Sequence, residues 1–165
     1  MSAQGKPARV LLMKIGVIAD THGLVRPEVA GLFRGVSLIL HAGDIGTPDV
    51  LSTLREAAPV RAVRGNVDKG AWAESLPETD VVACNGCFIY LLHDLTTLNL
   101  DPSAAGMDVV ISGHSHRPGE SRKNGVLYLN PGSAGPRRFK LPITAALLQI
   151  EEPGGITPEL ITLVP

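Results

Sequence analysis

The stretch that decides the fold is residues 15–23, which read Ile-Gly-Val-Ile-Ala-Asp-Thr-His-Gly. Five consecutive apolar or small residues are typical of a strand buried on both faces. An aspartate, a histidine and a glycine then follow within four positions. We therefore predict a buried strand that ends in a polar turn carrying Asp20 and His22.

The same pattern returns four more times along the chain. In each case an apolar run stops at Asp, Asn or His, with glycine beside most of them. These later clusters are Gly43-Asp44, Gly65-Asn66-Val67-Asp68, His93 and Gly113-His114-Ser115-His116. Ligands of α/β sheets gather at the carboxyl ends of strands, so we expect the clusters to converge on one crevice.

The order of the expected elements predicts an α/β fold. In the first half strands alternate with helices, which begin at Pro27 and at Thr47-Pro48, as in parallel βαβ units. The second half is richer in strands. The expected strands are 15–19, 36–40, 60–63, 81–84, 87–92, 108–112, 126–129, 143–150 and 160–164. We expect a single domain over residues 13–165, after a loosely ordered N-terminal extension, residues 1–12.

Composition excludes several classes of protein. The 165 residues are enough for one domain, and 44% hydrophobic residues with 18 glycines and 13 prolines indicate a globular chain with many tight turns. The formal charge of −1 gives no strong signal for nucleic acid or an acidic membrane.

The N-terminus carries no targeting signal that we can identify. Lys14 interrupts the apolar run 10–13, no cleavage pattern follows, and no stretch approaches the roughly 18 apolar residues of a membrane span. Met13 is an alternative start. We therefore expect a cytoplasmic protein without a membrane partner, and a homo-oligomer is left open.

Cys84 and Cys87 form a CxxC motif, which is found in zinc sites and redox pairs. The residues between them are Asn85-Gly86, however, a strong signal for a two-residue β-hairpin turn. No second ligand pair follows, and no helix begins at the motif. We interpret the cysteines as flanking a hairpin turn.

Each polar cluster taken alone has an ordinary explanation. Asp44 could cap a helix, Asn66 could be a turn residue, and His93 could be a satisfied core histidine. His114 and His116 are harder to dismiss, since a buried histidine pair is costly without partners and commonly binds metal. Together the clusters use four of the five histidines. The fifth, His41, is interpreted as structural or as a support for the ligands.

In this order the motifs Asp-x-His, Gly-Asp, Gly-Asn-x-Asp, His93, Gly-His-x-His and Asn-Pro-Gly-Ser (130–133) resemble the calcineurin-like metallophosphoesterase superfamily. The resemblance covers roughly residues 13–150, and the short chain is similar to the small bacterial and archaeal phosphodiesterases, which are related to a structural subunit of retromer. It implies a four-layer α-β-β-α sandwich of two mixed sheets flanked by helices.

The resemblance also implies two bound metal ions. One would be bound by Asp20, His22, Asp44 and His116. The other would be bound by Asp44, Asn66, His93 and His114. Asp44 would bridge them. Nitrogen and oxygen ligands without thiolate favour Mn, Fe, Zn, Co or Ni over Ca or Mg, and the family most often works with manganese.

The expected activity is hydrolysis of a phosphodiester or an activated phosphate ester. Two divalent ions bring four positive charges, and Asp20, Asp44 and a bridging hydroxide return three, so about one remains to attract phosphate. Metals roughly 3.5–4 Å apart would activate the hydroxide for in-line attack and clamp the leaving oxygen. Asn66 would also hold a phosphate oxygen.

Two positions depart from the family pattern. Val67 stands where larger phosphatases have a histidine that protonates the leaving group, and losing such an acid typically costs about 10²–10⁴-fold in rate. We therefore expect diesters and activated esters to be the better substrates. Asp68 is a further candidate catalytic residue. Asp94 stands where the family usually has glycine, and its role is open.

Substrate contacts and the competing functions are less determined by sequence. Arg137 is the candidate substrate-binding residue and, with Arg138, could instead be a solvated surface residue. The rival to an enzyme is a non-catalytic protein-interaction or regulatory metal-binding module on the same fold. Because all seven expected ligands are in place, the sequence favours the enzyme.

Overall fold

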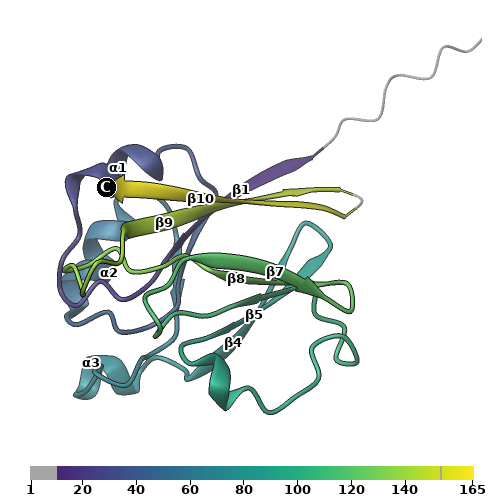
Figure 1. The fold of residues 1–165 in the computed structure, drawn as a ribbon, viewed down its shortest axis with the longest axis horizontal. Coiled ribbons are helices and arrows are strands. Elements are labelled where there is room, and N and C mark those ends of the chain that lie inside the picture. Colours follow the sequence, from purple (N-terminus) through teal and green to yellow (C-terminus); the bar gives the residue numbers. More distant parts are fainter. Residues whose placement is uncertain (1–10, 153) are drawn as a thin grey trace, which may run out of the picture.

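The computed structural model describes residues 11–152 and 154–165, which form two five-stranded sheets (Figure 1). In the first sheet β1, β2 and β3 are parallel, β9 pairs antiparallel to β1, and β10 pairs antiparallel to β9. The order is β10-β9-β1-β2-β3. The bounds of these strands are β1 Leu12–Ile18, β2 Leu38–His41, β3 Val60–Ala62, β9 Ile143–Glu151 and β10 Gly155–Val164.

The second sheet has the order β4-β5-β6-β8-β7 and is also mixed. Strands β5, β6 and β8 are parallel, whereas β4 and β7 pair antiparallel at its two edges. The bounds are β4 Thr79–Cys84, β5 Cys87–Leu92, β6 Val109–Ile111, β7 Gly119–Lys123 and β8 Val126–Asn130. Strand β7 was not expected from the sequence, because its polar residues show no alternation.

Two helices cover the outer face of the first sheet. Helix α1 (Pro27–Leu32) and helix α2 (Pro48–Arg55) both begin with proline, whose fixed φ suits the first turn and whose missing N–H costs nothing there. In α2 the buried residues are Val50, Leu51 and Leu54, the spacing of one helix face. They join Phe33 of the turn after α1 in one apolar cluster over the sheet.

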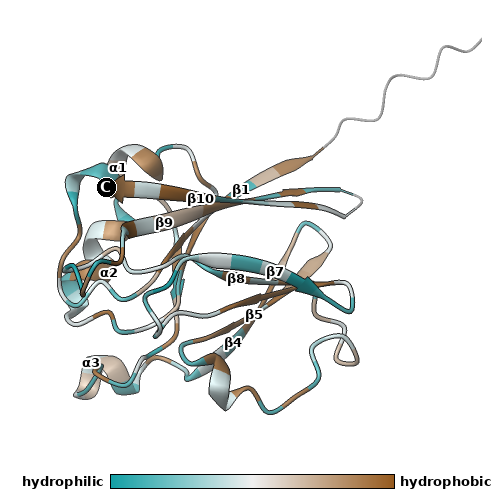
Figure 2. Cartoon of the chain, in the orientation of Figure 1, coloured by the Kyte–Doolittle hydropathy of each residue, from teal (hydrophilic) through white to brown (hydrophobic). Residues whose placement is uncertain are grey.

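The inner faces of the two sheets pack against each other and form the main core (Figures 1 and 2). Core residues occupy every second position of a strand, as Ile89 and Leu91 do in β5. Their side chains therefore point to the same face, between the two sheets. The loop that follows the 3₁₀ helix η1 (Leu95–Thr97), rather than an α-helix, packs on the outer face of the second sheet through Leu98, Leu100 and Met107. A short helix α3 (Ala71–Glu74), also unexpected, follows Gly70.

The predicted α/β sandwich of two mixed sheets is therefore confirmed. Strand β1 begins at Leu12, one residue earlier than the expected domain boundary, and residues 1–10 of the expected N-terminal extension lie outside the described residues. Among the described residues, no helix has the length and apolar character needed to cross a bilayer. The parallel strands of both sheets end at one side, and the polar clusters follow those ends.

Candidate metal centre

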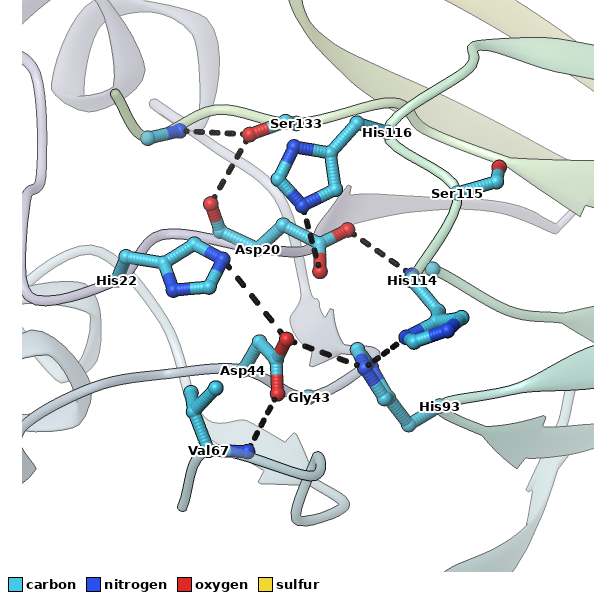
Figure 3. A network of polar contacts seen from close by, with 12 residues as sticks. Asp20, His22, Gly43, Asp44, Val67, His93, His114, Ser115, His116 and Ser133 are labelled. Atoms are coloured by element: carbon cyan, nitrogen blue, oxygen red, sulfur yellow. Dashed lines mark hydrogen bonds and ion pairs between the residues drawn. The ribbon is translucent and has the colours of Figure 1, made fainter. Parts of the chain in front are cut away.

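Seven polar side chains meet where the loops after five parallel strands converge (Figure 3). The loop after β1 carries Asp20 and His22, and the loops after β2 and β3 carry Asp44 and Asn66. From the second sheet, His93 follows β5. His114 and His116 follow β6. The order of strands in the two sheets thus brings together residues up to 96 positions apart in sequence.

Two groups of possible metal ligands result. In the first, one ligand atom each from Asp20, His22 and His116 lie within 4.8 Å of one another. In the second, the same holds for Asp44, His93 and His114. These are six of the seven ligands predicted from sequence, divided between two groups as the resemblance implies.

The second group includes the predicted amide ligand. Asn66 Oδ1 lies 2.9 Å from His93 Nε2 and 3.2 Å from His114 Nδ1. These two ring nitrogens are themselves 3.2 Å apart, and Asp44 Oδ2 lies 3.3 Å from His93 Nε2. Two nitrogens and two oxygens from four separate loops thus face one small volume.

Asp44 lies between the two groups. Its Oδ2 is 3.3 Å from His93 Nε2 and 3.8 Å from His22 Nε2, which belongs to the first group. Its Oδ1 accepts a hydrogen bond from the backbone N–H of Val67 at 3.1 Å. One carboxylate oxygen therefore faces both groups, the position that a bridging ligand requires.

Unpartnered polar atoms indicate what the site is built to hold. Among the described residues, Asp20 Oδ1, His22 Nε2 and His116 Nδ1 are buried and have no hydrogen-bond partner, although buried polar groups are nearly always satisfied. Asp20 Oδ1 and His22 Nε2 both belong to residues of the first group. A divalent cation would satisfy such atoms at once. The mixed nitrogen and oxygen donors, without thiolate, fit a first-row transition metal.

The charges of the metal-free site are strongly perturbed. Burial raises the pKa of Asp20 to about 7, with the neighbouring Asp44 adding to the shift. Burial, helped by the positive charge of Arg138, lowers the pKa of His116 to about 4. Asp44 keeps a pKa below its usual value because hydrogen bonds from His93 and from Val67 N–H outweigh its burial. Burial thus leaves the Asp20 carboxyl partly protonated near neutral pH, and a cation bound beside it would favour the charged form.

The turns that carry the ligands need close backbone approach, and glycine allows it. A Cβ on Gly65 would lie 2.1 Å from Asp44 Oδ1 and 2.3 Å from the Asp44 nitrogen. A Cβ on Gly135 would lie 2.4 Å from the carbonyl oxygen of Asp20. The loops after β3 and β8 therefore press directly on the loops that hold the two aspartates.

His41 lies outside both groups, as expected from its interpretation as a structural residue. It is fully buried, its Nδ1 accepts the N–H of Gly43 at 3.1 Å, and its Nε2 therefore donates to Thr21 Oγ1 at 3.0 Å. Thr21 Oγ1 in turn donates to the carbonyl of Ile45 at 2.9 Å. Burial lowers the pKa of His41 to about 3, so it is neutral and holds the loops after β1 and β2 together.

Asp68 makes contacts that the sequence did not suggest. Its buried carboxylate accepts three backbone N–H bonds, from Gly65 at 2.8 Å, Gly46 at 2.9 Å and Ile45 at 3.1 Å. It thereby ties the loop after β3 to the loop after β2. The observed contacts give it a structural use, and its expected catalytic part stays a prediction that no contact supports.

The two arginines after the Asn-Pro-Gly-Ser turn differ in position. Arg137 donates to the carbonyls of Leu141 at 3.3 Å and Pro165 at 2.7 Å, and so fastens its loop to the C-terminal strand. Arg138 makes no such contact among the described residues, and its charge acts on Asp20, His22 and His116. The sequence had indicated Arg137 as the candidate substrate-binding residue, with solvation of both arginines at the surface as the alternative.

The CxxC motif forms the expected hairpin. Cys84 and Cys87 are directly opposed where β4 and β5 join, and both are free and buried. Asn85 and Gly86 have φ of 50° and 81°, as the two central residues of a type I′ turn require. Burial raises the pKa of both thiols, so neither is activated as a nucleophile.

Two cavities open beside the second ligand group. One of about 310 Å³ is lined by Arg64, Asn66, His93, Asp94 and His114, among others. The other has a volume of about 420 Å³ and is also lined by Asp94 and His114. A further cavity of about 340 Å³, between α1 and α2, is lined by none of the predicted ligands. Space for a substrate therefore exists directly against the candidate metal centre.

The sandwich and its two ligand groups define a metal-binding α/β protein, and comparison with known proteins identifies which kind. The family described as "Calcineurin-like phosphoesterase superfamily domain" matches residues 13–153. The chain therefore belongs to the calcineurin-like phosphoesterase superfamily. A relative named "Probable metallophosphoesterase" from Methanothermobacter thermautotrophicus is 40% identical over 133 residues, covering 73% of this chain and 77% of that protein.

Solved structures show the same fold. A structure described as a "Novel Archaeal Phosphodiesterase" superposes with a TM-score of 0.74 at 23% identity, covering 90% of this chain and 100% of the other. "Vacuolar Protein Sorting 29" from Cryptosporidium parvum superposes with a TM-score of 0.73 at 19% identity, covering 93% and 99%. At these identities the likeness concerns the fold alone.

Proposed function

We propose that this protein is a binuclear-metal-dependent phosphoesterase that prefers phosphodiesters or activated phosphate esters. The observation that carries the proposal is the pair of ligand groups around Asp44, one oxygen of which faces His22 in the first group and His93 in the second. Metallophosphoesterase relatives and a phosphodiesterase with the same fold support the same reading.

The ligands divide between the two metals as follows. Asp20, His22, Asp44 and His116 would hold one ion, and Asp44, Asn66, His93 and His114 the other. When bound, such a pair would lower the pKa of a bound water, which could then act as the nucleophile, and would neutralise charge on the phosphate. Manganese is our first choice because the family most often works with manganese, while the imidazole, carboxylate and amide ligands also suit Fe, Zn, Co or Ni.

The protein's own groups then position the ester. The amide of Asn66 is placed at the wall of the 310 Å³ cavity, where its N–H could donate to a phosphate oxygen while its Oδ1 faces the metal ligands. Arg138, whose charge reaches the first ligand group, is a better anchor for the phosphate than Arg137, which is engaged with Leu141 and Pro165.

The preference for good leaving groups follows from what surrounds Val67. Its side chain is 42% exposed beside Asp44 and cannot give a proton. Asp68 already accepts three backbone N–H bonds, which hold its carboxylate between the loops after β2 and β3. Without an acid to protonate it, the alkoxide of an alkyl monoester would have to leave as a strong base. We therefore expect such a monoester to react slowly.

A metal-dependent assay tests the proposal. With Mn²⁺, bis(p-nitrophenyl) phosphate should be hydrolysed faster than a simple alkyl phosphate monoester. Asp44→Asn and His93→Ala should each lose at least about 10²-fold, since Asp44 faces both ligand groups and His93 is a ligand of the second. Asp49→Asn, an exposed aspartate in the first turn of α2, is the matched control and should keep full activity.

Two results would contradict the proposal. Equal turnover by Asp44→Asn would exclude a mechanism that depends on a shared carboxylate. Tight binding of two metal ions without turnover of any ester would favour the rival function, an interaction or regulatory module on this fold.

A further inference from the structure

Asp94 is the residue beside the metal centre whose role the sequence left open. It follows His93 and begins the 3₁₀ helix η1. Its Oδ1 accepts hydrogen bonds from the N–H of Thr96 at 2.9 Å and from Thr96 Oγ1 at 2.8 Å. These two bonds hold the carboxylate in one orientation. The other oxygen, Oδ2, then lies 3.8 Å from His114 Nε2.

The two nitrogens of the His114 ring face different neighbours. Its Nδ1 faces the second ligand group, 3.2 Å from both Asn66 Oδ1 and His93 Nε2. The opposite nitrogen, Nε2, faces Asp94. A metal binds the nitrogen that has no proton, so with Nδ1 as ligand the proton of a neutral ring must be on Nε2. That N–H would point at a carboxylate.

His114 needs such a support more than the other histidines of the site. Its side chain is 46% exposed, whereas those of His93 and His116 are 7% and 4% exposed. The remote nitrogen of His93 is already fixed, because Nδ1 lies 2.7 Å from the carbonyl oxygen of Ala42. Within the described residues, the other carboxylates near these histidines, those of Asp20 and Asp44, face the ligating nitrogens. The Asp94 carboxylate faces a nitrogen on the opposite side of its ring from the ligand groups.

We propose that Asp94 is a positioning residue that orients His114 as a metal ligand and strengthens metal binding at the group formed by Asp44, His93 and His114. The inference rests on the proposed metal pair. A carboxylate that accepts the remote N–H of a ligating histidine fixes the ring and makes the ligand more basic, which typically changes metal affinity by about 10–100-fold. At 3.8 Å the two groups are in contact but do not form a closed hydrogen bond.

The arrangement makes the two metal sites unequal. The second group has supports for both of its histidines, the Ala42 carbonyl for His93 and the Asp94 carboxylate for His114. In the first group His116 Nδ1, on the far side of the ring from the nitrogen that faces Asp20, has no partner. The second group should therefore bind its ion more tightly and fill first.

The test is calorimetric titration of the metal-free protein with Mn²⁺, comparing wild type with Asp94→Asn. Asparagine keeps the oxygen that caps η1 and replaces the charged oxygen facing His114 by an NH2 group, which cannot accept its N–H. We expect two binding events in the wild type, of which the tighter weakens by about 10–100-fold in the variant while the weaker is unchanged. Asp101→Asn is the matched control, because Asp101 Oδ1 accepts N–H bonds from Ser103 and Ala104 in a similar turn away from the ligands.

A spectroscopic signature separates positioning from simple folding support. In the Zn²⁺-loaded protein, the His114 Nε2–H resonance should shift upfield in Asp94→Asn, as expected when a charged acceptor is lost. Thr96→Val, which removes a hydrogen bond to Asp94 but no charge, should leave it nearly in place.

The possible failures are distinct. Unchanged Mn²⁺ affinity in Asp94→Asn, equal weakening of both events, or no metal binding by the wild type would each overturn the inference. Selective weakening in a protein that hydrolyses no ester would uphold the role of Asp94 and refute the proposed phosphoesterase activity alone.

Discussion

Five of the seven candidate ligands have a positive φ, a conformation that residues other than glycine rarely adopt. The φ values are 54° at Asp20, 46° at His22, 53° at Asp44, 69° at His114 and 60° at His116. Each such residue costs on the order of 1–3 kcal/mol and persists only where its surroundings hold it. Here the backbone does so, since Asp20 N–H donates to Gly43 and His22 N–H to Asp44, both at 3.0 Å. The ligands are thus strained into place before a metal arrives.

A single methyl group at Gly65 should disable the centre. In Gly65→Ala the new Cβ would overlap the carboxylate and backbone of Asp44, so we expect loss of metal binding and a destabilisation of roughly 1–3 kcal/mol. The control is Gly31→Ala in α1, where a Cβ meets nothing within 4 Å. It should stabilise the protein by about 0.5–1 kcal/mol, since alanine favours a helix.

Urea unfolding and Mn²⁺ titration of both variants check this prediction. A Gly65→Ala protein with wild-type metal affinity would show that the loop after β3 can retreat from Asp44, and that the close approach is not required.

At the residue scale, the sequence predicts ligands better than it predicts their supports. Asp20, Asp44 and the histidines were recognisable because chemically suitable side chains follow apolar strands. The clamp made by Asp68 was not, because an aspartate in a glycine-led turn looks the same whether it binds its own loop or a neighbouring one. Likewise, nothing local distinguishes Arg138 from Arg137. Those roles depend on which loops meet in three dimensions.

At the scale of elements, what could be predicted depended on burial. The strands that form the core were evident from their apolar runs. Strand β7, with the sequence Gly-Glu-Ser-Arg-Lys, is an exposed edge strand without an apolar face, so periodicity could not detect it. The one local signal was Asn124-Gly125, whose φ of 51° and 78° form a second type I′ turn. Helix α3, with four residues, is too short to show a period.

The two Asn-Gly hairpins offer a matched pair of variants. Asn85 Nδ2 donates to the carbonyls of Leu11 at 2.8 Å and Ile150 at 2.9 Å, and so links the β4–β5 turn to the other sheet. Asn124 sits in the same kind of turn, and none of the observed side-chain hydrogen bonds among the described residues involves its amide group. Replacing either by glycine keeps the positive φ. We expect Asn85→Gly to lose about 1–3 kcal/mol and Asn124→Gly less than about 0.5 kcal/mol.

Chemical denaturation of the two variants measures this difference. Equal losses of unfolding free energy would mean that the asparagine side chains act only through turn conformation, and that the bonds of Asn85 to the first sheet contribute nothing.

At the scale of the whole molecule, the site exists because both sheets end their parallel strands at the same side. The loops after β1, β2 and β3 supply four of the seven candidate ligands, and the loops after β5 and β6 supply three. The order of motifs along the chain predicts that these strand ends meet. The way in which the two sheets pack against each other could not be predicted from the sequence. Asp20 and His114 show the result, since the His114 N–H donates to Asp20 Oδ2 across the sheets at 3.1 Å.

Metal binding should therefore stabilise the entire sandwich. An ion present at 100 times its Kd adds about 2.7 kcal/mol if it binds only the folded chain. For a protein of 165 residues, each kcal/mol shifts Tm by roughly 2–4 °C, so one filled site should raise Tm by about 5–10 °C. Excess chelator should reverse the gain. Asp44→Asn should lose most of it, whereas Asp49→Asn should keep it.

The gain should also grow with pH between 6 and 8. Metal binding requires Asp20 without its proton, and the folded, metal-free protein keeps that proton up to a pKa of about 7 because the carboxyl is buried. The pKa of His93 is raised as well, since contact with Asp44 outweighs its burial, so its proton opposes metal binding in the same direction. His116, with a pKa of about 4, is neutral throughout this range and contributes no competition. Thermal unfolding with and without Mn²⁺ at pH 6, 7 and 8 measures the trend. A gain in Tm that falls as pH rises would show that protons do not compete for these ligands.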